Sequence, residues 1–252
     1  MSRLILSAYL IIIIGVASCH CSQPDQPTSS PGTTLTGNYR SDSTTIPVPT
    51  DWVLTEHVYQ ADVWVSSDQS WLDKLGITPS TGKAVVVNAS NEEVTRPGGG
   101  LDGSLANWAR SAGLKPWKNA VLADGTPAAR LEAGRFALFS TNFGWIYLAV
   151  GPRASGVSSL EAAKNKVSEL YNNMLCKAQQ DGAERIVLPA ISTVIFADKG
   201  PGFTKEEFIG TIYKGMIQGI ASFQQKHPGH ILKIILNNWD KKVVEKVKKL
   251  NS

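Results

Sequence analysis

Two spacings of apolar residues alternate along most of the chain. Short runs of consecutive apolar, often β-branched residues are typical of buried strands, and apolar residues recurring every three or four positions are typical of helices. Strands that alternate with helices predict an α/β fold of three layers, α/β/α, around a mainly parallel mixed sheet. We expect strands at 57–65, 83–88, 136–140, 145–150, 184–191 and 231–236, and helices at 70–75, 104–112, 158–180 and 204–225.

Two of the expected helices begin with a capping-box pattern. Ser158 is followed three residues later by Glu161, and Thr204 is followed by Glu207 at the same spacing. In this pattern each side chain accepts a hydrogen bond from the other residue's backbone N–H. We therefore expect Ser158 and Thr204 to cap their helices.

The strand at 83–88 leads into the stretch with the clearest chemical character. It ends on Asn88, and a triple-glycine turn follows at 98–100, then Asp102 and the helix at 104–112. Glycines without Cβ atoms let backbone N–H groups approach a ligand closely. A helix N-terminus adds a favourable dipole, so this arrangement predicts a site for an anion such as a diphosphate. It matches neither a Walker A loop nor a GxGxxG fingerprint.

Three segments, in order, resemble the macro domain family, which binds ADP-ribose. NASN…GGGLDG at 88–103 is similar to the family's usual NAAN…GGGVDG, LAVGP at 148–152 to its strand ending in VGP, and VLPAISTVIF at 187–196 to its second phosphate loop. The resemblance covers roughly residues 58–239. It implies the macro domain fold for the α/β architecture.

The resemblance also implies which residues contact the ligand. Asp62 would accept a hydrogen bond from the adenine amino group, although an acid near a strand end is also commonly solvated or a cap. The glycines would form the first diphosphate loop, and residues 192–196 the second. The implied ligand-binding residues are Asp62, Asn88, Gly98, Gly99, Gly100, Ser192, Thr193, Val194, Ile195 and Phe196.

Asn91 and Asp102 match the asparagine and aspartate that face the distal ribose in macro domains that hydrolyse ADP-ribosyl esters. Asn91 would hold a ribose hydroxyl, and Asp102 would orient or deprotonate a water or position the substrate. The alternatives are an Asx turn for Asn91 and a helix N-cap for Asp102. The segment between them is one residue longer than in the usual hydrolases and contains Pro97.

The second loop departs from the family at two positions. Val194 and Ala197 stand where glycine is usual. If the glycine matching Val194 needs a positive φ, valine would be strained there or would force another loop shape, which would weaken phosphate binding. Phe196 keeps an aromatic ring that would pack on the distal ribose or in the core.

The resemblance therefore implies ADP-ribose or an ADP-ribosylated protein as partner. It implies hydrolysis of ADP-ribosyl esters, from acidic side chains or from O-acetyl-ADP-ribose. A binding module without turnover, and a degenerate domain acting in protein interaction at the envelope, are the alternatives. We expect no cofactor and no metal site, because the cysteines and histidines are scattered without metal-ligand spacing.

The N-terminus predicts export and lipid attachment. Residues 1–18 have a basic start and a short apolar core, which is typical of a signal peptide. Small residues before Cys19 resemble a bacterial lipoprotein cleavage site, so we expect acyl chains such as palmitate on Cys19 and an anchor at the bacterial cell envelope. An ordinary signal peptide cut nearby is the alternative. Residues 19–50 are rich in Ser, Thr and Pro and predict a disordered tether, which leaves 51–252 as the domain.

The net charge of +4 comes largely from a lysine-rich run at 241–249. Lysines there alternate with valines and a leucine, as in an amphipathic surface helix whose lysines are solvated. We therefore expect no specific nucleic-acid partner, and a monomer.

Overall fold

The computed structural model describes residues 34–35, 46–47, 58–61, 63–78, 83–198 and 200–237. The predicted signal peptide, Cys19, Asp62 and residues 238–252 lie outside the described residues. Within the predicted tether, β1 (Thr34–Leu35) pairs antiparallel with β2 (Ile46–Pro47). No helix in the part of the chain that is described is long and apolar enough to cross a membrane.

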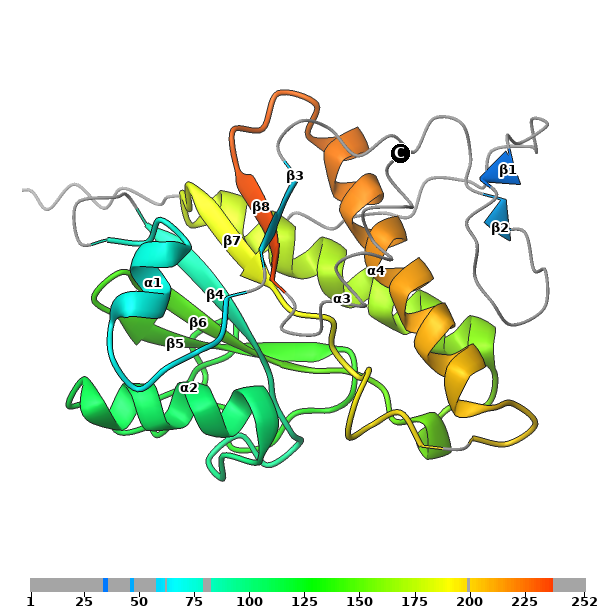
Figure 1. Cartoon of the computed structure of the whole chain (residues 1–252), viewed down its shortest axis with the longest axis horizontal. Coiled ribbons are helices and arrows are strands. Elements are labelled where there is room, and N and C mark those ends of the chain that lie inside the picture. The colour runs from blue at the N-terminus through cyan, green and yellow to red at the C-terminus, as the bar shows by residue number, and fades with distance from the viewer. Residues whose placement is uncertain are drawn as a thin grey trace, which may run out of the picture. The chain divides into compact units, whose positions relative to one another are not determined.

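A six-stranded sheet forms the centre of the domain, in the order β3-β8-β7-β4-β6-β5 (Figure 1). All neighbours are parallel except β5 and β6, which form an antiparallel hairpin. The predicted α/β fold with a mainly parallel mixed sheet is thus confirmed. The strands are β3 (Val58–Ala61), β4 (Ala84–Ala89), β5 (Arg135–Thr141), β6 (Gly144–Val150), β7 (Arg185–Leu188) and β8 (Lys233–Asn237).

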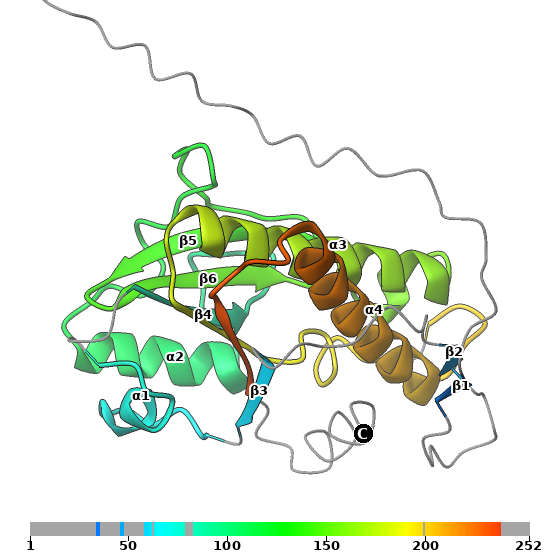
Figure 2. The same ribbon diagram turned by 90° about the horizontal axis from the view of Figure 1, so that it is seen from above.

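Helices cover both faces of this sheet (Figures 1 and 2). The short α1 (Ser70–Lys74) and α2 (Gly100–Ser111) lie on one face, and the long α3 (Leu160–Gln180) and α4 (Lys205–Lys226) on the other. A 3-10 turn, η1 (Ala154–Gly156), follows β6.

The central strand β4 shows why a continuous apolar run forms here. Val85 and Val87 belong to the core beneath α3 and α4, whereas Ala84 and Val86 belong to the core beneath α1 and α2. Because successive side chains of a strand point to opposite faces, a strand covered on both sides needs apolar residues at every position. This burial fixes the register of β4 and therefore where its polar end emerges.

Two helix starts differ from the sequence expectation. The cap of α3 is Ser159, whose side chain accepts a hydrogen bond from the N–H of Ala162, so the capping box predicted at Ser158 is wrong. The box at Thr204 and Glu207 is confirmed, with both reciprocal hydrogen bonds present. The helix expected at 104–112 begins four residues earlier, because the glycine turn runs directly into it.

Candidate functional site

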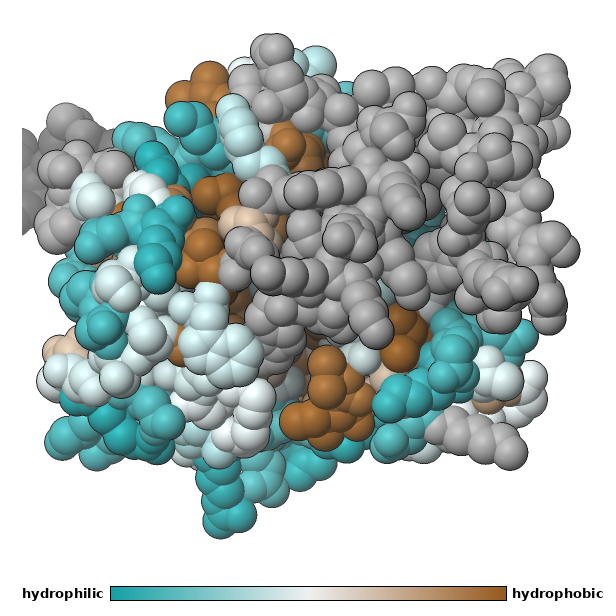
Figure 3. All heavy atoms as spheres, viewed as in Figure 1, coloured by the Kyte–Doolittle hydropathy of each residue, from teal (hydrophilic) through white to brown (hydrophobic). Residues whose placement is uncertain are grey.

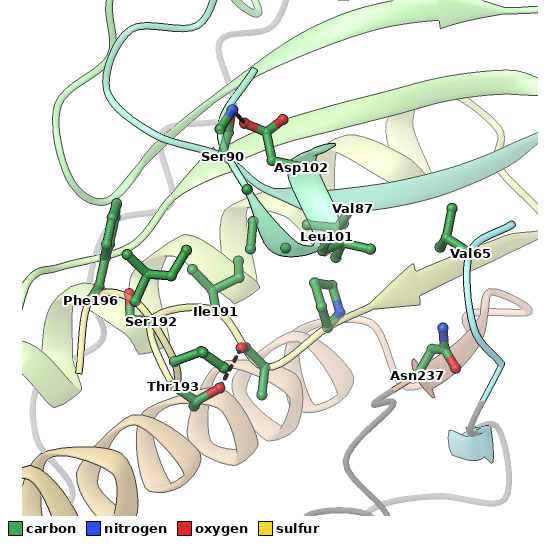
Figure 4. A pocket seen from close by; sticks show the side chains of 18 of the residues that line it. Val65, Val87, Ser90, Leu101, Asp102, Ile191, Ser192, Thr193, Phe196 and Asn237 are labelled. Atoms are coloured by element: carbon green, nitrogen blue, oxygen red, sulfur yellow. Dashed lines mark hydrogen bonds between the residues drawn. The ribbon is translucent and has the colours of Figure 1, made fainter. Parts of the chain in front are cut away.

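A cavity of about 250 Å³ opens at the carboxyl ends of the central parallel strands. Figure 4 shows Phe196 and Ser192 toward one end and Val65 and Asn237 toward the other. Its lining includes the turn at 98–100, the loop at 189–196 and residues 63 and 65. Parallel α/β sheets commonly bind ligands at this edge, because the loops after the strands converge there.

Asp102 is the most constrained polar residue of the cavity. Its side chain lines the cavity, yet the residue is only 2% exposed. The carboxylate accepts hydrogen bonds from the Nδ2 of Asn88 at 2.6 Å, from the backbone N–H of Gly98 at 2.6 Å and from the indole Nε1 of Trp117 at 3.0 Å. Burial raises the pKa of Asp102, and these three donors oppose that rise only in part.

The N-cap alternative for Asp102 is wrong. The N-cap of α2 is Gly99, and Asp102 lies in the first turn of the helix. From there its carboxylate reaches back to the N–H of Gly98, one residue before the cap. A negative charge in the first turn also interacts favourably with the helix dipole. Asp102 therefore holds the glycine turn to the start of α2.

The two predicted asparagines occupy different environments. Asn88 is fully buried, does not line the cavity and holds Asp102. Asn91 lines the cavity, and its Nδ2 donates to the carbonyl of Arg96 at 2.9 Å, which is not an Asx turn. The Oδ1 of Asn91 is buried and has no hydrogen-bond partner among the described residues. A buried acceptor of this kind is suited to a hydroxyl donor from a ligand.

All three glycines of the predicted first loop line the cavity. Gly100 has a positive φ of 61°, a backbone conformation that glycine adopts without steric cost. A Cβ at Gly99 would meet no atom within 4 Å, so the space beside this residue is open. The turn therefore presents backbone without side chains to the cavity.

The second predicted loop, residues 192–196, also lines the cavity throughout. The positive φ in this loop lies at Ser192, at 67°, and not at Val194. Val194 is therefore not strained, and its side chain is 61% exposed, beside Ile195 at 59%. On the face drawn in Figure 3, hydrophobic residues form several patches between hydrophilic and intermediate ones. Ala197 is fully buried and packs in the core.

Close packing of the loop explains the glycine of the VGP segment. A Cβ at Gly151 would lie 2.1 Å from the Oγ of Ser192 and 2.4 Å from the Cγ2 of Ile191. These distances are far inside van der Waals contact, so the end of β6 and the second loop meet only because residue 151 has no side chain. The VGP segment thus packs directly behind the second loop, which lines the cavity.

Arg153 lines the cavity and pairs with Glu92, and the sequence predicted neither residue. The guanidinium pairs with Glu92 through Nε–Oε1 at 2.9 Å and Nη2–Oε2 at 3.1 Å, and it lies 4.0 Å from the ring centroid of Phe196. The hydrogen bond to Arg153 lowers the pKa of Glu92, and the same bond raises the pKa of Arg153. The sequence signal that was available for these two residues is their position: Glu92 directly follows Asn91, and Arg153 directly follows the VGP segment.

At the opposite end of the cavity, the side chain of Asn237 bonds the backbone of Val63 as a neighbouring strand would. Asn237 accepts a hydrogen bond from the N–H of Val63 at 2.8 Å and donates one to its carbonyl at 3.0 Å. This pair extends the ladder between β3 and β8 beyond the last strand residues. It positions residues 63 and 65 along the cavity. The predicted adenine ligand Asp62, one residue earlier, is outside the described residues.

No group of three or more His, Cys, Asp or Glu side chains arranged to hold a metal ion occurs in the described ranges.

Comparisons with known proteins agree with this architecture. The family model of the macro domain matches residues 87–199. The crystal structure of the Trypanosoma brucei macrodomain in complex with ADP-ribose is similar, with a TM-score of 0.54 at 16% identity, over 81% of this chain and 73% of that one. The same macrodomain in complex with ADP gives a TM-score of 0.51 at 16% identity, over 77% and 68% of the two chains.

An uncharacterized protein of Pyrobaculum aerophilum is 33% identical over 123 residues, or 44% of this chain. The match spans 57% of that relative's length. The similar structures show that the fold is the macro domain fold, and the match to the macro domain family model is confined to residues 87–199.

Proposed function

We propose that this protein binds ADP-ribose in the cavity and hydrolyses ADP-ribosyl esters. The observation that carries the binding proposal is the convergence of the glycine turn and the second loop on one cavity at the sheet's carboxyl edge. The Trypanosoma brucei macrodomain of the same fold was crystallised with ADP-ribose. The family resemblance of both loops supports the same ligand.

The shape of the cavity supports one orientation of the ligand. The diphosphate would lie between the glycine turn and the loop that contains Ser192 and Thr193. The distal ribose would lie against Phe196, and the adenine at the end formed by Val65 and Asn237. The turn contributes backbone N–H groups and the N-terminus of a twelve-residue helix, both favourable for a diphosphate.

For the hydrolase, Asn91 would accept a hydrogen bond from a ribose hydroxyl through its unpartnered Oδ1. Asp102 would act chiefly by positioning, because its carboxylate already accepts hydrogen bonds from three groups. A water that Asp102 deprotonates would have to approach through the remaining acceptor position of Oδ2, which accepts only the hydrogen bond from Gly98. Water would attack the ester carbonyl carbon, and the bond from that carbon to the ribose oxygen would break. The ribose oxygen would leave with a proton from the water, so that the products are the free ribose hydroxyl and the carboxylic acid.

A binding module without turnover is the second candidate function. The observation that favours it is that three protein donors occupy most of the hydrogen-bonding capacity of the Asp102 carboxylate, two on Oδ1 and one on Oδ2. This leaves about one acceptor position, on Oδ2, through which the carboxylate can take a proton from water. The two candidates share the ligand and differ in chemistry.

Two measurements test these proposals. Isothermal titration with ADP-ribose tests binding, and we expect micromolar or tighter affinity; no detectable heat or competition would refute the ligand. Release of ADP-ribose from an aspartate- or glutamate-linked conjugate tests hydrolysis, with Asp102→Ala as the variant. Full turnover in Asp102→Ala would eliminate the assigned role of this carboxylate, and absence of turnover in the wild type would favour the binding module.

We also propose that Cys19 carries lipid that anchors the protein at the bacterial cell envelope. The small residues before Cys19 and the apolar segment ahead of them support this proposal. Cells fed labelled palmitate should label the wild-type protein and not Cys19→Ser. Equal labelling of both would exclude attachment at this cysteine.

A further inference from the structure

Arg153 connects the two loops that form the cavity. It follows the end of β6, whereas Glu92 follows β4 and Phe196 follows β7. The guanidinium pairs with Glu92 on the first loop and lies over the ring of Phe196 on the second. One side chain thus joins segments that emerge from three adjacent strands.

Both partners of Arg153 are themselves held by backbone hydrogen bonds. The N–H of Leu131 donates to the carbonyl of Glu92 at 2.9 Å, and the N–H of Ala154 donates to the carbonyl of Phe196 at 3.0 Å. Since these backbone positions are fixed, the guanidinium governs mainly the orientation of the Phe196 side chain. Arg153 and Phe196 both line the cavity: Phe196 lies at the end opposite Asn237 (Figure 4), and the guanidinium of Arg153 lies over its ring.

The chemistry of the contact requires arginine in particular. The planar guanidinium binds the carboxylate through two parallel hydrogen bonds and at the same time covers an aromatic face. A lysine ammonium has the charge but neither the fork nor the flat surface. The two bonds to Glu92 use Nε and Nη2, so both N–H groups of Nη1 lie outside the ion pair.

We infer that Arg153 is a positioning residue that holds Phe196 against the distal ribose and thereby selects ligands that carry this ribose. The inference rests on the proposed binding of ADP-ribose. ADP has the same adenosine and diphosphate but ends before the distal ribose. Arg153 therefore contributes to the affinity for ADP-ribose and little to the affinity for ADP.

The experiment compares the dissociation constants of ADP-ribose and ADP by isothermal titration for the wild type and four variants. Arg153→Ala should weaken ADP-ribose about tenfold, as expected for loss of a stacked, ion-paired arginine, and should change ADP by less than about twofold. Arg153→Lys and Glu92→Gln should fall between the wild type and Arg153→Ala. Arg110→Ala removes an exposed arginine of α2 whose side chain bonds Asn107 on the same helix, and should change neither constant.

Three outcomes would overturn the inference. Equal weakening of both ligands in Arg153→Ala would show a general effect on the fold. Unchanged affinity for ADP-ribose would show that Phe196 is positioned without Arg153. Absence of ADP-ribose binding in the wild type would refute the proposed function, and the inference with it. If the wild type binds ADP-ribose, either of the first two results refutes the inference alone.

Discussion

The indole N–H of Trp117 donates a hydrogen bond of 3.0 Å to the carboxylate of Asp102. Trp117 is fully buried and adopts a positive φ of 58°, which is costly for a bulky residue. It follows α2 in the chain and returns to the first turn of that helix through this bond. The glycine turn of the cavity therefore depends on a tryptophan that does not line it.

We expect Trp117→Phe to lower the free energy of unfolding more than Trp108→Phe does. Both tryptophans are buried, but the Nε1 of Trp108 has no hydrogen-bond partner among the described residues. Loss of ring volume is similar in the two variants, and only Trp117→Phe removes a donor from a buried carboxylate. The difference should be about 1.5–3 kcal/mol in urea unfolding. Equal destabilisation would show that the hydrogen bond contributes nothing.

The pKa of Asp102 predicts a pH-dependent contribution to stability. Burial raises this pKa in the folded state above the unfolded value of about 3.9, so the folded state binds the proton more tightly. The stability contributed by Asp102 is therefore full below pH of about 4 and falls as pH rises through the folded pKa. Urea unfolding of the wild type and Asp102→Asn should be compared across pH. As pH rises through this window, the free energy of unfolding of the wild type should fall relative to that of Asp102→Asn. A rise in the free energy of unfolding of the wild type relative to the variant would mean that the three donors lower the pKa of Asp102 more than burial raises it.

Substitutions at Gly99 should change ligand binding without changing folding. A Cβ there meets no atom within 4 Å, and the backbone has an extended φ of −91° that any residue adopts. Gly99→Glu should therefore fold normally but place a carboxylate beside the bound diphosphate, and we expect at least a hundredfold weaker binding of ADP-ribose. Gly99→Ala is the matched control, with a loss below about fivefold. A Gly99→Glu variant that binds as the wild type does would exclude the turn from the phosphate site.

Glycine substitutions in the second loop should have opposite effects at two nearby positions. Ser192 has φ of 67°, so Ser192→Gly should relieve steric strain and raise the free energy of unfolding by up to about 1 kcal/mol. Val194 does not have a positive φ, so Val194→Gly should only add flexibility to the unfolded chain. It should therefore lower the free energy of unfolding by about 0.5–1 kcal/mol. Thermal and urea unfolding measure both. Stabilisation by Val194→Gly would show that the valine is strained after all.

The local features of the fold were predictable from the sequence. The apolar run at 84–87 identified a strand buried on both faces, and the Thr204 pattern identified a helix start. The start of α2 was missed because glycine has a low intrinsic helix propensity. In the structure, the Asp102 hydrogen bond to Gly98 and the continuing helix offset that preference.

The long-range contacts of the site were not predictable. Glu92 and Arg153 are 61 residues apart, and no periodicity relates them. The Asn88–Asp102–Trp117 hydrogen bonds likewise depend on where α2 and the chain after it pack. Strain expected at Val194 is found at Ser192, because the backbone of a loop adapts to the contacts around it, here the close approach to Gly151.

By itself, the sequence determined the alternation of strands and helices, the glycine turn and the apolar faces, since hydrophobic periodicity and turn chemistry act over a few residues. Only the tertiary structure decided that Asp102 is held by three donors and that Arg153 joins two loops. These contacts arise when the parallel strands bring their carboxyl ends to one edge. Their geometry then depends on how the helices and loops pack together, which is a property of the whole domain.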